Sequence, residues 1–593
     1  MIEKNIKKKP ENYFVFSAQE EFWPENVKIL FAGKWCLNPF NKTHKEKSNF
    51  EILKTSIYEF ENQRKEINYC DHLYEKLIEE ITDKLNKYHK ISWSKRSWKM
   101  LIGLWLNRYI AIINDRLNIL IEANKNHRLK FKKINFKDES LFSYDLESSS
   151  KKILDHEWNE KLIRRLQKLL TEKNFDYSYL NNLKNNKTIK ESNHKINFYQ
   201  KLINKFWNFF PLSKNNKYFF NKIYIGDFIT TLKLFFKLRE FPVKYFIDEK
   251  PILKKINFSE RKYFSTNLEI QDLKEKIIRF LLPETIPTLY VEGFNELKKK
   301  AFSANLPENK IIFTCNAWRD TIFKFWIADQ TNKGNKLIYG QHGGGYGMLH
   351  DHLGDKYELD ICDRYLTWGQ ENKNNKKIYP NIAQIIIHEK RKETISNDKI
   401  LIIPPTFQYY YYRNEVYDPN NIYTEFEKIR QFILNLKNKN EILFKAHPIE
   451  KKRKFSLEKL VKNNLQNVKI INSNKNLDKL IENSQISIFF HVSTAFLKNL
   501  ALNKPSIFVC DDLFIKRLKK DSLTHFQKLI DCKIVFLDAI EASKFLNKSG
   551  NNIIDWWNDK NVQTSIQDFS QIYVKKTPYS LEIFKKSIAD PII

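Results

Sequence analysis

The sequence predicts an α/β protein made of two parallel-sheet units, and three observations support this prediction. Short buried strands alternate with helices at the spacing of βαβ units, before and after a polar break at residues 372–377. Several strands run directly into polar residues, as strands do at the ligand-binding edge of a parallel sheet. Glycine is scarce, at 13 of 593 residues, yet five glycines lie between Gly340 and Gly347. We therefore expect two α/β units, each built on a parallel sheet.

The first unit is predicted to cover residues 1–395. Apolar runs at residues 27–31 and 310–314 predict strands, and a run at 337–339 predicts the strand that enters the glycine-rich loop. From about residue 50 to 280 the apolar period changes to that of helices. We interpret this stretch as a large helical insertion in the first unit.

The second unit is predicted to cover residues 396–540. Buried runs at residues 400–403, 441–445 and 486–490 predict its strands, with helical patterns between them. From residue 541 to 593 the pattern becomes helical throughout. We expect this last stretch to form a helical tail that follows the second sheet.

The charge of the chain restricts its partners. Its formal net charge is +32, from 102 lysine and arginine residues against 70 acidic residues. The lysines are spread along the whole sequence, and the basic arm or arginine-rich motif of a dedicated nucleic-acid-binding protein is missing. We therefore expect no nucleic-acid partner, whereas an anionic substrate or loose contact with an anionic membrane surface is compatible with the charge.

Cysteine usage and hydropathy point to a compartment. The six cysteines lie far apart and form no C-x-x-C pair, which argues against a zinc ribbon or a disulfide scaffold and fits a reducing cytoplasm. The first residues lack the apolar segment of a signal peptide, and no apolar run approaches the ~20 residues of a membrane span. We expect a cytoplasmic protein.

A histidine and a lysine follow one strand of the second unit. Lys445 ends the run at 441–445, and Pro448 halts the strand two residues after Ala446, so that His447 projects at the edge of the sheet. A cation beside a histidine suits the phosphate of a ligand. The alternative is a surface histidine with a purely structural role.

Two hydroxyls stand where another strand of the second unit passes into a helix. Ser493 and Thr494 follow the run at 486–490, and either is a natural N-cap. The unpaired amide groups and the positive end of the helix dipole make such a position an anion site. Plain capping needs only one hydroxyl, so the pair favours phosphate binding.

The glycine-rich loop of the first unit carries His342, which can act as a general base or acid or can hydrogen-bond a diphosphate or sugar. Its glycines allow a ligand to approach the backbone closely. Asp351 and Glu358 are candidate catalytic carboxylates near the same cleft. Gln341, Gly343, Gly344 and Gly345 of the same loop are the residues that we expect to contact a bound ligand.

The same region contains a candidate metal-binding motif. His350 and His352 flank Asp351, and a His-x-His pair can supply two metal ligands from one strand face. No third ligand has suitable spacing, so we assign no metal and no cofactor.

Several of these motifs carry a resemblance to known families. The order of His447-Pro448 and Ser493-Thr494 resembles the His-Pro and Ser/Thr motifs of bacterial sialyltransferases, ulosonic-acid (Kdo) transferases and teichoic-acid glycerophosphotransferases. More narrowly, the segments FAGKWC at 31–36, GQHGGGYG at 340–347 and DRYLTWG at 363–369 are similar to a family of surface-carbohydrate (O-antigen) transferases first noted in spirochaetes. The glycerophosphotransferases carry Trp-His-Gly-Thr where this chain has Gln-His-Gly-Gly.

The resemblance implies a GT-B-like fold, with two Rossmann-like domains facing a cleft and the helical insertion in the N-terminal, acceptor-side domain. It implies a metal-independent glycosyltransferase of O-antigen or capsule synthesis that uses a CMP-type nucleotide-sugar donor, with an ulosonic acid such as Kdo or a sialic-acid-like sugar. The acceptor would be a glycan or a lipid-linked molecule, and the enzyme would reach it at the inner face of the membrane. In those families the His-Pro histidine and the hydroxyls contact the donor phosphate, which carries over to Lys445, His447, Pro448, Ser493 and Thr494.

Three rival functions follow from the same residues. A polyol-phosphate transferase would use a CDP-alcohol at the same motifs. A nucleic-acid-binding protein would explain the charge of +32. A non-catalytic assembly or membrane-docking protein would need neither His342 nor His447 for polysaccharide synthesis.

Overall fold

The computed structural model describes residues 9–37, 49–183, 216–240, 256–303, 311–389, 398–437, 441–449 and 457–592. Three features of the sequence predictions lie outside these residues. They are the N-terminal segment compared with a signal peptide, the start of the strand at 310 and the boundary near 395. The division of the chain into the predicted domains therefore stays a prediction. None of the helices in the described part combines the length and the hydropathy that a membrane span needs.

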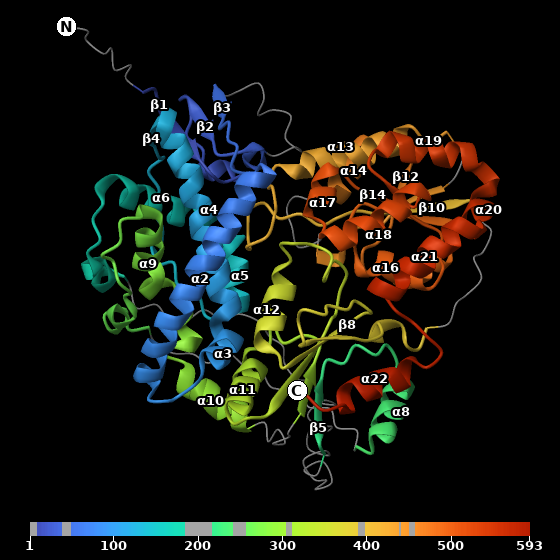
Figure 1. Cartoon of the computed structure of the whole chain (residues 1–593). Helices are drawn as coiled ribbons and strands as arrows, with labels where there is room; N and C mark the ends of the chain where they lie inside the picture. The colour runs from blue at the N-terminus through green and yellow to red at the C-terminus, as the bar shows by residue number, and fades with distance from the viewer. Residues whose placement is uncertain are drawn as a thin grey trace.

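The strands form three parallel sheets, one more than the sequence predicts. The additional sheet lies at the N-terminal side and has the order β3-β2-β1-β4 (Figure 1). Its strands are β1 (Glu11–Val15), β2 (Ile29–Phe31), β3 (Phe50–Ile52) and β4 (Arg128–Lys130). The strand predicted at 27–31 thus joins this sheet and not the sheet of the glycine-rich loop. Strand periodicity carries no information on which sheet a strand enters, because that depends on pairing at long range.

Long helices cover this sheet, as the helical period predicts. α2 (Phe60–His89) and α4 (Leu104–Asn126) pack against each other and bury apolar residues at positions three and four apart, among them Ile78, Ile81 and Leu85. Between them, α3 (Lys95–Trp98) leads into a π-helical turn at Lys99–Gly103. The same region holds α5 (Leu146–Ile153), α6 (His156–Glu172), α9 (Leu273–Thr285) and α10 (Phe294–Ser303).

The middle sheet carries the glycine-rich loop and has the order β5-β6-β7-β8-β9. Its strands are β5 (Tyr218–Asn221), β6 (Ile311–Thr314), β7 (Lys336–Gly340), β8 (Arg364–Thr367) and β9 (Ile378–Pro380). Its helices are α8 (Phe228–Leu238), α11 (Thr321–Asn332) and α12 (Leu353–Ile361). The predicted helical insertion at 50–280 therefore also supplies strands, namely β3, β4 and β5. Each has only three or four residues, too few for a clear period of two.

The C-terminal sheet has the order β12-β11-β10-β13-β14-β15, with all strands parallel. In chain order this is 3-2-1-4-5-6, the order of dinucleotide-binding Rossmann sheets. The strands are β10 (Lys399–Ile403), β11 (Glu441–Phe444), β12 (Val468–Ile470), β13 (Ile486–Phe489), β14 (Ser506–Val509) and β15 (Val535–Phe536). The helices are α13 (Asn421–Leu434), α14 (Leu457–Asn464), α15 (Leu477–Glu482), α16 (Thr494–Ala501), α17 (Asp512–Arg517) and α18 (Lys520–Asp531). The α/β class is confirmed.

The C-terminal tail is helical, as predicted, but its last helix returns to the middle sheet. The tail comprises α19 (Ala539–Ser549), α20 (Ile553–Asn558), α21 (Lys560–Tyr573) and α22 (Ser580–Ala589). α22 lies beside α8 at the far side of the middle sheet (Figure 1), where the ring of Phe584 packs 5.4 Å from that of Phe313. Arg364 on β8 donates a hydrogen bond to the carbonyl oxygen of Ser587 at 2.8 Å. The tail thus joins the middle and C-terminal sheets.

Candidate active site

The glycine-rich loop after β7 touches the N-terminus of α16 on the C-terminal sheet. The amide of Gly344 donates a hydrogen bond to Oγ1 of Thr494 at 3.0 Å. A Cβ atom on Gly344 would lie 2.7 Å from the carbonyl carbon of Ser493 and 2.8 Å from the amide nitrogen of Thr494. Backbone cannot yield at that separation, so only glycine allows the two segments to meet. The structure therefore brings together the loop and the Ser-Thr pair that the sequence assigns to opposite walls of a cleft.

Two further glycines shape the same loop. Gly345 and Gly347 have φ values of +84° and +71°, in the left-handed region that glycine adopts without steric cost. The amide of Gly347 donates to Oδ2 of Asp355 at 2.5 Å, which fixes the loop to the first turn of α12. Beyond this point Met348 and His350 form backbone hydrogen bonds with the segment at 517–519 of the C-terminal unit. The loop is thus held from both sheets.

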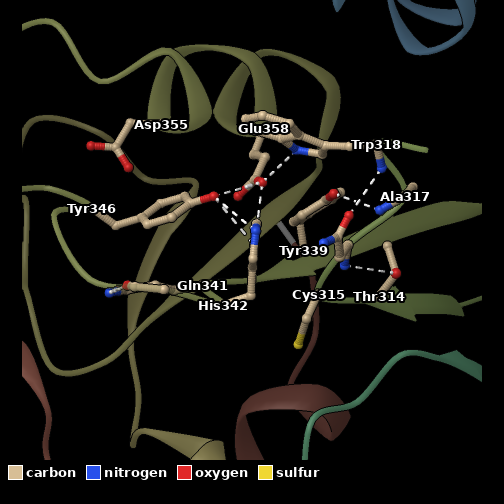
Figure 2. A network of polar contacts seen from close by, with 12 residues as sticks. Thr314, Cys315, Ala317, Trp318, Tyr339, Gln341, His342, Tyr346, Asp355 and Glu358 are labelled. Atoms are coloured by element: carbon tan, nitrogen blue, oxygen red, sulfur yellow. Dashed lines mark hydrogen bonds and ion pairs between the residues drawn. The ribbon is translucent and has the colours of Figure 1, made fainter. Parts of the chain in front are cut away.

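His342 lies within a buried polar network centred on Glu358 of α12 (Figure 2). Glu358 is fully buried, and its Oε1 accepts hydrogen bonds from Trp318 Nε1 at 2.8 Å and from the Tyr346 hydroxyl at 3.2 Å. Its Oε2 accepts one from the Tyr365 hydroxyl at 3.1 Å. Nδ1 of His342 is 3.5 Å from Oε1, and the Tyr346 hydroxyl lies 3.2 Å from Nε2 of the same ring. Glu358 and Tyr346 thus orient the imidazole, and Trp318 and Tyr365 hold Glu358 in place.

Burial sets the charge state of this pair. Removal from water, together with the positive potential of His352, lowers the pKa of His342 to about 4. Removal from water raises the pKa of Glu358 well above its usual value. The imidazole is therefore neutral near pH 7, and the side chain of His342 is still 19% exposed. A neutral, oriented and partly accessible imidazole can accept a proton from a bound hydroxyl.

Gln341 has a supporting position. Its side chain is only 2% exposed; Oε1 accepts from the amide of Trp368 at 2.9 Å, and Nε2 donates to the carbonyl oxygen of Gly343 at 3.0 Å. Its own carbonyl oxygen accepts from Nε2 of Gln384 at 2.6 Å. These bonds place Gln341 beneath the loop, where it holds the backbone, and do not place it on the wall facing a donor.

Asp351 is not brought to His342. Its carboxylate pairs with Arg517 at 3.0 Å and accepts from the amide of Val416 at 2.6 Å, so it joins the loop to the C-terminal unit. His352 caps α12, with Nδ1 accepting from the amide of Asp355 at 3.2 Å. Asp351 and His352 of the His-Asp-His motif thus have structural roles. A sequence pattern alone does not reveal such roles.

Lys445 is also engaged elsewhere. Its side chain is buried, with Nζ donating to the carbonyl oxygen of Ser473 at 3.0 Å, and burial lowers its pKa. His447 is exposed at the same sheet edge, and its Nδ1 accepts from the amide of Ile449 at 3.2 Å. With Nδ1 as acceptor, the neutral ring carries its hydrogen on Nε2 and can donate it to an anion. His447 keeps the position expected of a phosphate ligand, whereas Lys445 does not.

His491 is a further candidate site residue, and no sequence motif by itself distinguishes it. It follows β13 directly, near His447, and removal from water together with the positive potential of His447 lowers its pKa to about 4. Its Nδ1 atom is buried and has no hydrogen-bond partner among the described residues. A buried acceptor or donor without a partner is uncommon, and it points to a ligand or water at this sheet edge.

The two hydroxyls of α16 each retain a hydrogen to donate. Oγ of Ser493 accepts from the amide of Phe496 at 3.2 Å as the N-cap, and Oγ1 of Thr494 accepts from Gly344. Each oxygen is an acceptor in these bonds, so its own O–H can donate to an anionic oxygen. The first amide groups of the helix are available in the same direction. Capping and anion binding are thus compatible here, and both hydroxyls are used structurally.

The fold and the site define an enzyme that transfers a group between two substrates. One sheet presents an oriented neutral imidazole, and the facing sheet, of nucleotide-binding strand order, presents donors suited to an anionic leaving group. The chain belongs to the LIC12162 family of transferases, whose family model matches residues 12–588. This confirms the family resemblance found in the sequence motifs and the assignment as a transferase.

Solved structures of low sequence identity are similar over about half of the chain. The wall teichoic acid polymerase TagF is 12% identical, with a TM-score of 0.30 over 51% of this chain and 75% of that protein. MurG of Acinetobacter baumannii is 8% identical, with a TM-score of 0.28 over 50% and 80% of the two chains. The spinosyn rhamnosyltransferase SpnG is 8% identical, with a TM-score of 0.28 over 47% and 74%. No curated protein sequence matches this chain significantly.

Proposed function

We propose that this transferase is a glycosyltransferase of surface-polysaccharide synthesis that moves a sugar from a CMP-type nucleotide donor to a glycan or lipid-linked acceptor. The single observation that carries the proposal is the contact of the glycine-rich loop with α16. Through it, the loop that carries His342 lies against the N-terminus of α16, which begins at Thr494. A donor phosphate and an acceptor hydroxyl need an anion-binding group and a base within one cleft.

The C-terminal half would hold the donor phosphate. The hydroxyls of Ser493 and Thr494, the first amides of α16 and the Nε2–H of His447 are the proposed donors, with His491 at the same edge. Several neutral donors and a helix dipole can stabilise the negative charge that grows on a departing phosphate. The CMP identity of the nucleotide and the ulosonic-acid identity of the sugar rest on the family motifs at His447-Pro448 and Ser493-Thr494.

The middle sheet would activate the acceptor. The acceptor oxygen attacks the anomeric carbon of the donor sugar, and the bond from that carbon to the phosphate oxygen breaks. The electron pair of this bond leaves with the nucleotide phosphate, and the proton of the acceptor hydroxyl passes to His342. Glu358 would act as a positioning residue, because it contacts His342 and not the substrate in this scheme.

The proposed location is the cytoplasm at the inner face of the membrane. Nucleotide-activated sugars and a reducing environment for six unpaired cysteines both fit the cytoplasm. The formal net charge of +32 favours contact with an anionic membrane surface, where a lipid-linked acceptor would be found.

The test starts with a thermal-shift screen of CMP, CDP, UDP, GDP and their sugars. We expect the cytidine nucleotides to stabilise the protein and CMP-Kdo or CMP-sialic acid to be turned over with release of CMP. A phosphodiester in the product, seen by phosphorus NMR after incubation with a CDP-alcohol, would instead identify a polyol-phosphate transferase. Steep salt-dependent binding to random DNA without any turnover would overturn the proposal.

Two variants test the donor side by calorimetry. His447→Ala and Thr494→Val should each weaken CMP binding about tenfold, since one hydrogen bond to a charged group contributes about 1.5–3 kcal/mol. His72→Ala, on the exposed face of α2, is the matched control and should bind CMP as the parent does. An unchanged CMP affinity in His447→Ala would remove this residue from the donor site.

A further inference from the structure

A cavity of about 480 Å³ lies on the face of α12 that is turned away from the candidate active site. Leu353, Lys356, Tyr357 and Asp360 line it and recur three and four residues apart, so they share one side of the helix. Glu358 lies on the opposite side, within the network around His342. One helix thus separates the cavity from the residues proposed to act in transfer.

The other walls come from the helical layer over the N-terminal sheet. Asp71, Tyr74 and Glu75 on α2 share one face, again by a spacing of three and four residues. Gly103 ends the π-helical turn before α4, and a Cβ atom there would lie 2.7 Å from the hydroxyl oxygen of Tyr74. Asn107 follows one turn later and also lines the cavity. π-Helical turns interrupt helices at functional positions more often than elsewhere.

Asn107 is a polar group on the cavity wall that the described part of the fold leaves without a partner at one atom. Its side chain is only 7% exposed, and its amide oxygen is buried without a hydrogen-bond partner in the described part of the chain. An amide oxygen accepts hydrogen bonds, so a ligand that carries a hydroxyl would satisfy it. A buried polar group with no partner costs stability, and its presence on a cavity wall points to an occupant.

The carboxylates on the walls are each paired with a lysine, and Lys377, which also lines the cavity, donates to the carbonyl oxygen of Leu359 at 3.2 Å. Asp71 pairs with Lys356 at 2.6 Å, and Asp360 pairs with Lys99 at 2.6 Å. Lys99 also contacts Glu75 at 2.8 Å. An anionic or cationic ligand would have to compete with these pairs, whereas a neutral ligand with several hydroxyls can donate to the carboxylates and accept from the ammonium groups without breaking them.

The remaining properties narrow the class of ligand. The rings of Tyr74 and Tyr357 give apolar surface between the polar walls, and the volume is within the range of small-molecule sites. The cavity opens to solvent at Glu75 and Asp360, whose side chains are 50% and 42% exposed. A sugar ring matches both properties of the cavity. Its apolar face can lie against the tyrosine rings, and its hydroxyls can bond the polar walls.

We propose that this cavity is an accessory carbohydrate-binding site, distinct from the transfer site, that holds a neutral sugar residue. The inference goes beyond the proposed transfer reaction and does not depend on the identity of the donor. A glycan anchored here lies against the helix that carries Glu358, which would keep a long acceptor near the transfer site.

The test is ligand-observed NMR on the full chain with glucose, galactose, mannose, rhamnose and N-acetylglucosamine as probes. We expect saturable binding of at least one of them. Asn107→Leu, which removes the amide, and Asn375→Trp, which fills the mouth of the cavity from a surface turn, should weaken that binding at least tenfold. Asn374→Trp changes the neighbouring exposed residue, which does not line the cavity, and should bind as the parent does.

Three outcomes would overturn the proposal. They are the absence of saturable binding of every probe, equal binding by Asn375→Trp and its control Asn374→Trp, and a glucose 6-phosphate affinity higher than that of glucose. CMP-induced thermal stabilisation measured on the same variants keeps this test separate from the proposed function. It should persist in Asn375→Trp even where sugar binding is lost.

Discussion

The amide of Gly344 donates a hydrogen bond to Oγ1 of Thr494 at 3.0 Å, across 150 residues of sequence and between two different sheets. This contact fixes the separation of the His342 side of the cleft from the α16 side. Its neighbour Gly343 provides a comparison, because a Cβ atom there would lie 3.5 Å from the same Oγ1 atom, an ordinary van der Waals distance.

Gly344→Ala should therefore separate the two walls, whereas Gly343→Ala should be tolerated. We expect Gly344→Ala to lower stability by about 1–3 kcal/mol, the usual cost of overpacking, and to reduce transfer at least tenfold. Urea unfolding and initial transfer rates measure the two effects. Equal rates for the two alanine variants would show that the contact does not set the geometry of the cleft.

Replacement of His342 tests its role as the base. His342→Gln keeps a polar side chain of similar size but accepts no proton, so the transfer rate should fall by about 10²–10⁴. CMP affinity should change less than twofold, because the residue stands on the acceptor side. A variant that keeps more than a tenth of the parent rate would exclude His342 as the general base.

Glu358→Gln tests the positioning of that imidazole. The two carboxyl oxygens receive hydrogens from Trp318, Tyr346 and Tyr365, whereas an amide offers one acceptor oxygen in their place. We expect a loss of about 1–3 kcal/mol in stability and a fall in kcat with little change in KM for the donor. Restoration of kcat by Glu358→Asp to within tenfold would support a positioning role, and unchanged kcat in Glu358→Gln would argue against one.

The contribution of three buried histidines to the stability of the protein should decrease between pH 6.5 and pH 4. Burial lowers the pKa values of His89, His342 and His491 to about 4, below the usual value of 6.5. At these three sites the unfolded chain binds more protons than the folded chain in this window, so their contribution to the free energy of unfolding falls as the pH falls and levels off below about pH 4. Buried acids with raised pKa values, among them Glu358, Glu160 and Glu425, contribute in the opposite direction. Urea midpoints of the parent and of single histidine variants at pH 7.5 and 5 isolate the histidine contribution.

His491→Gln tests how much of the pH dependence of stability comes from His491. The change in the free energy of unfolding from pH 7.5 to pH 5 should favour the folded state more in this variant than in the parent. The reason is that the variant lacks one buried group that binds a proton on unfolding. His72→Gln on the exposed surface is the control. An identical pH dependence in parent and His491→Gln would contradict the buried neutral state of this histidine.

The sequence locates the strand ends of the site but not the network around them. His342, His447 and Ser493-Thr494 could be found because each follows a buried strand, and the carboxyl ends of parallel strands meet at one edge. Trp318 and Tyr365 could not be assigned to Glu358, because their elements meet only through tertiary packing. No local pattern distinguishes a buried tyrosine that donates to a carboxylate from one that only fills space.

The less successful predictions have the same cause. Asp351 was expected beside the reacting groups, but its partner Arg517 is 166 residues away in the chain. Lys445 was expected at a phosphate, but it bonds a carbonyl oxygen of the turn at Ser473. The third sheet was missed because β3 and β4 are three-residue strands without a measurable period. Each error concerns a long-range pairing.

The return of α22 to the middle sheet has a consequence for the order of folding during synthesis. Phe584 and Ile588 complete an apolar cluster with Phe313, Ile338 and Leu366. More than 200 residues separate the two parts of this cluster along the chain, so the sheet that carries His342 remains uncovered on one face while the C-terminal sheet is being made. The apolar cluster of the middle sheet can be completed only after residue 588 has emerged from the ribosome. Until then, the incomplete middle sheet must avoid aggregation.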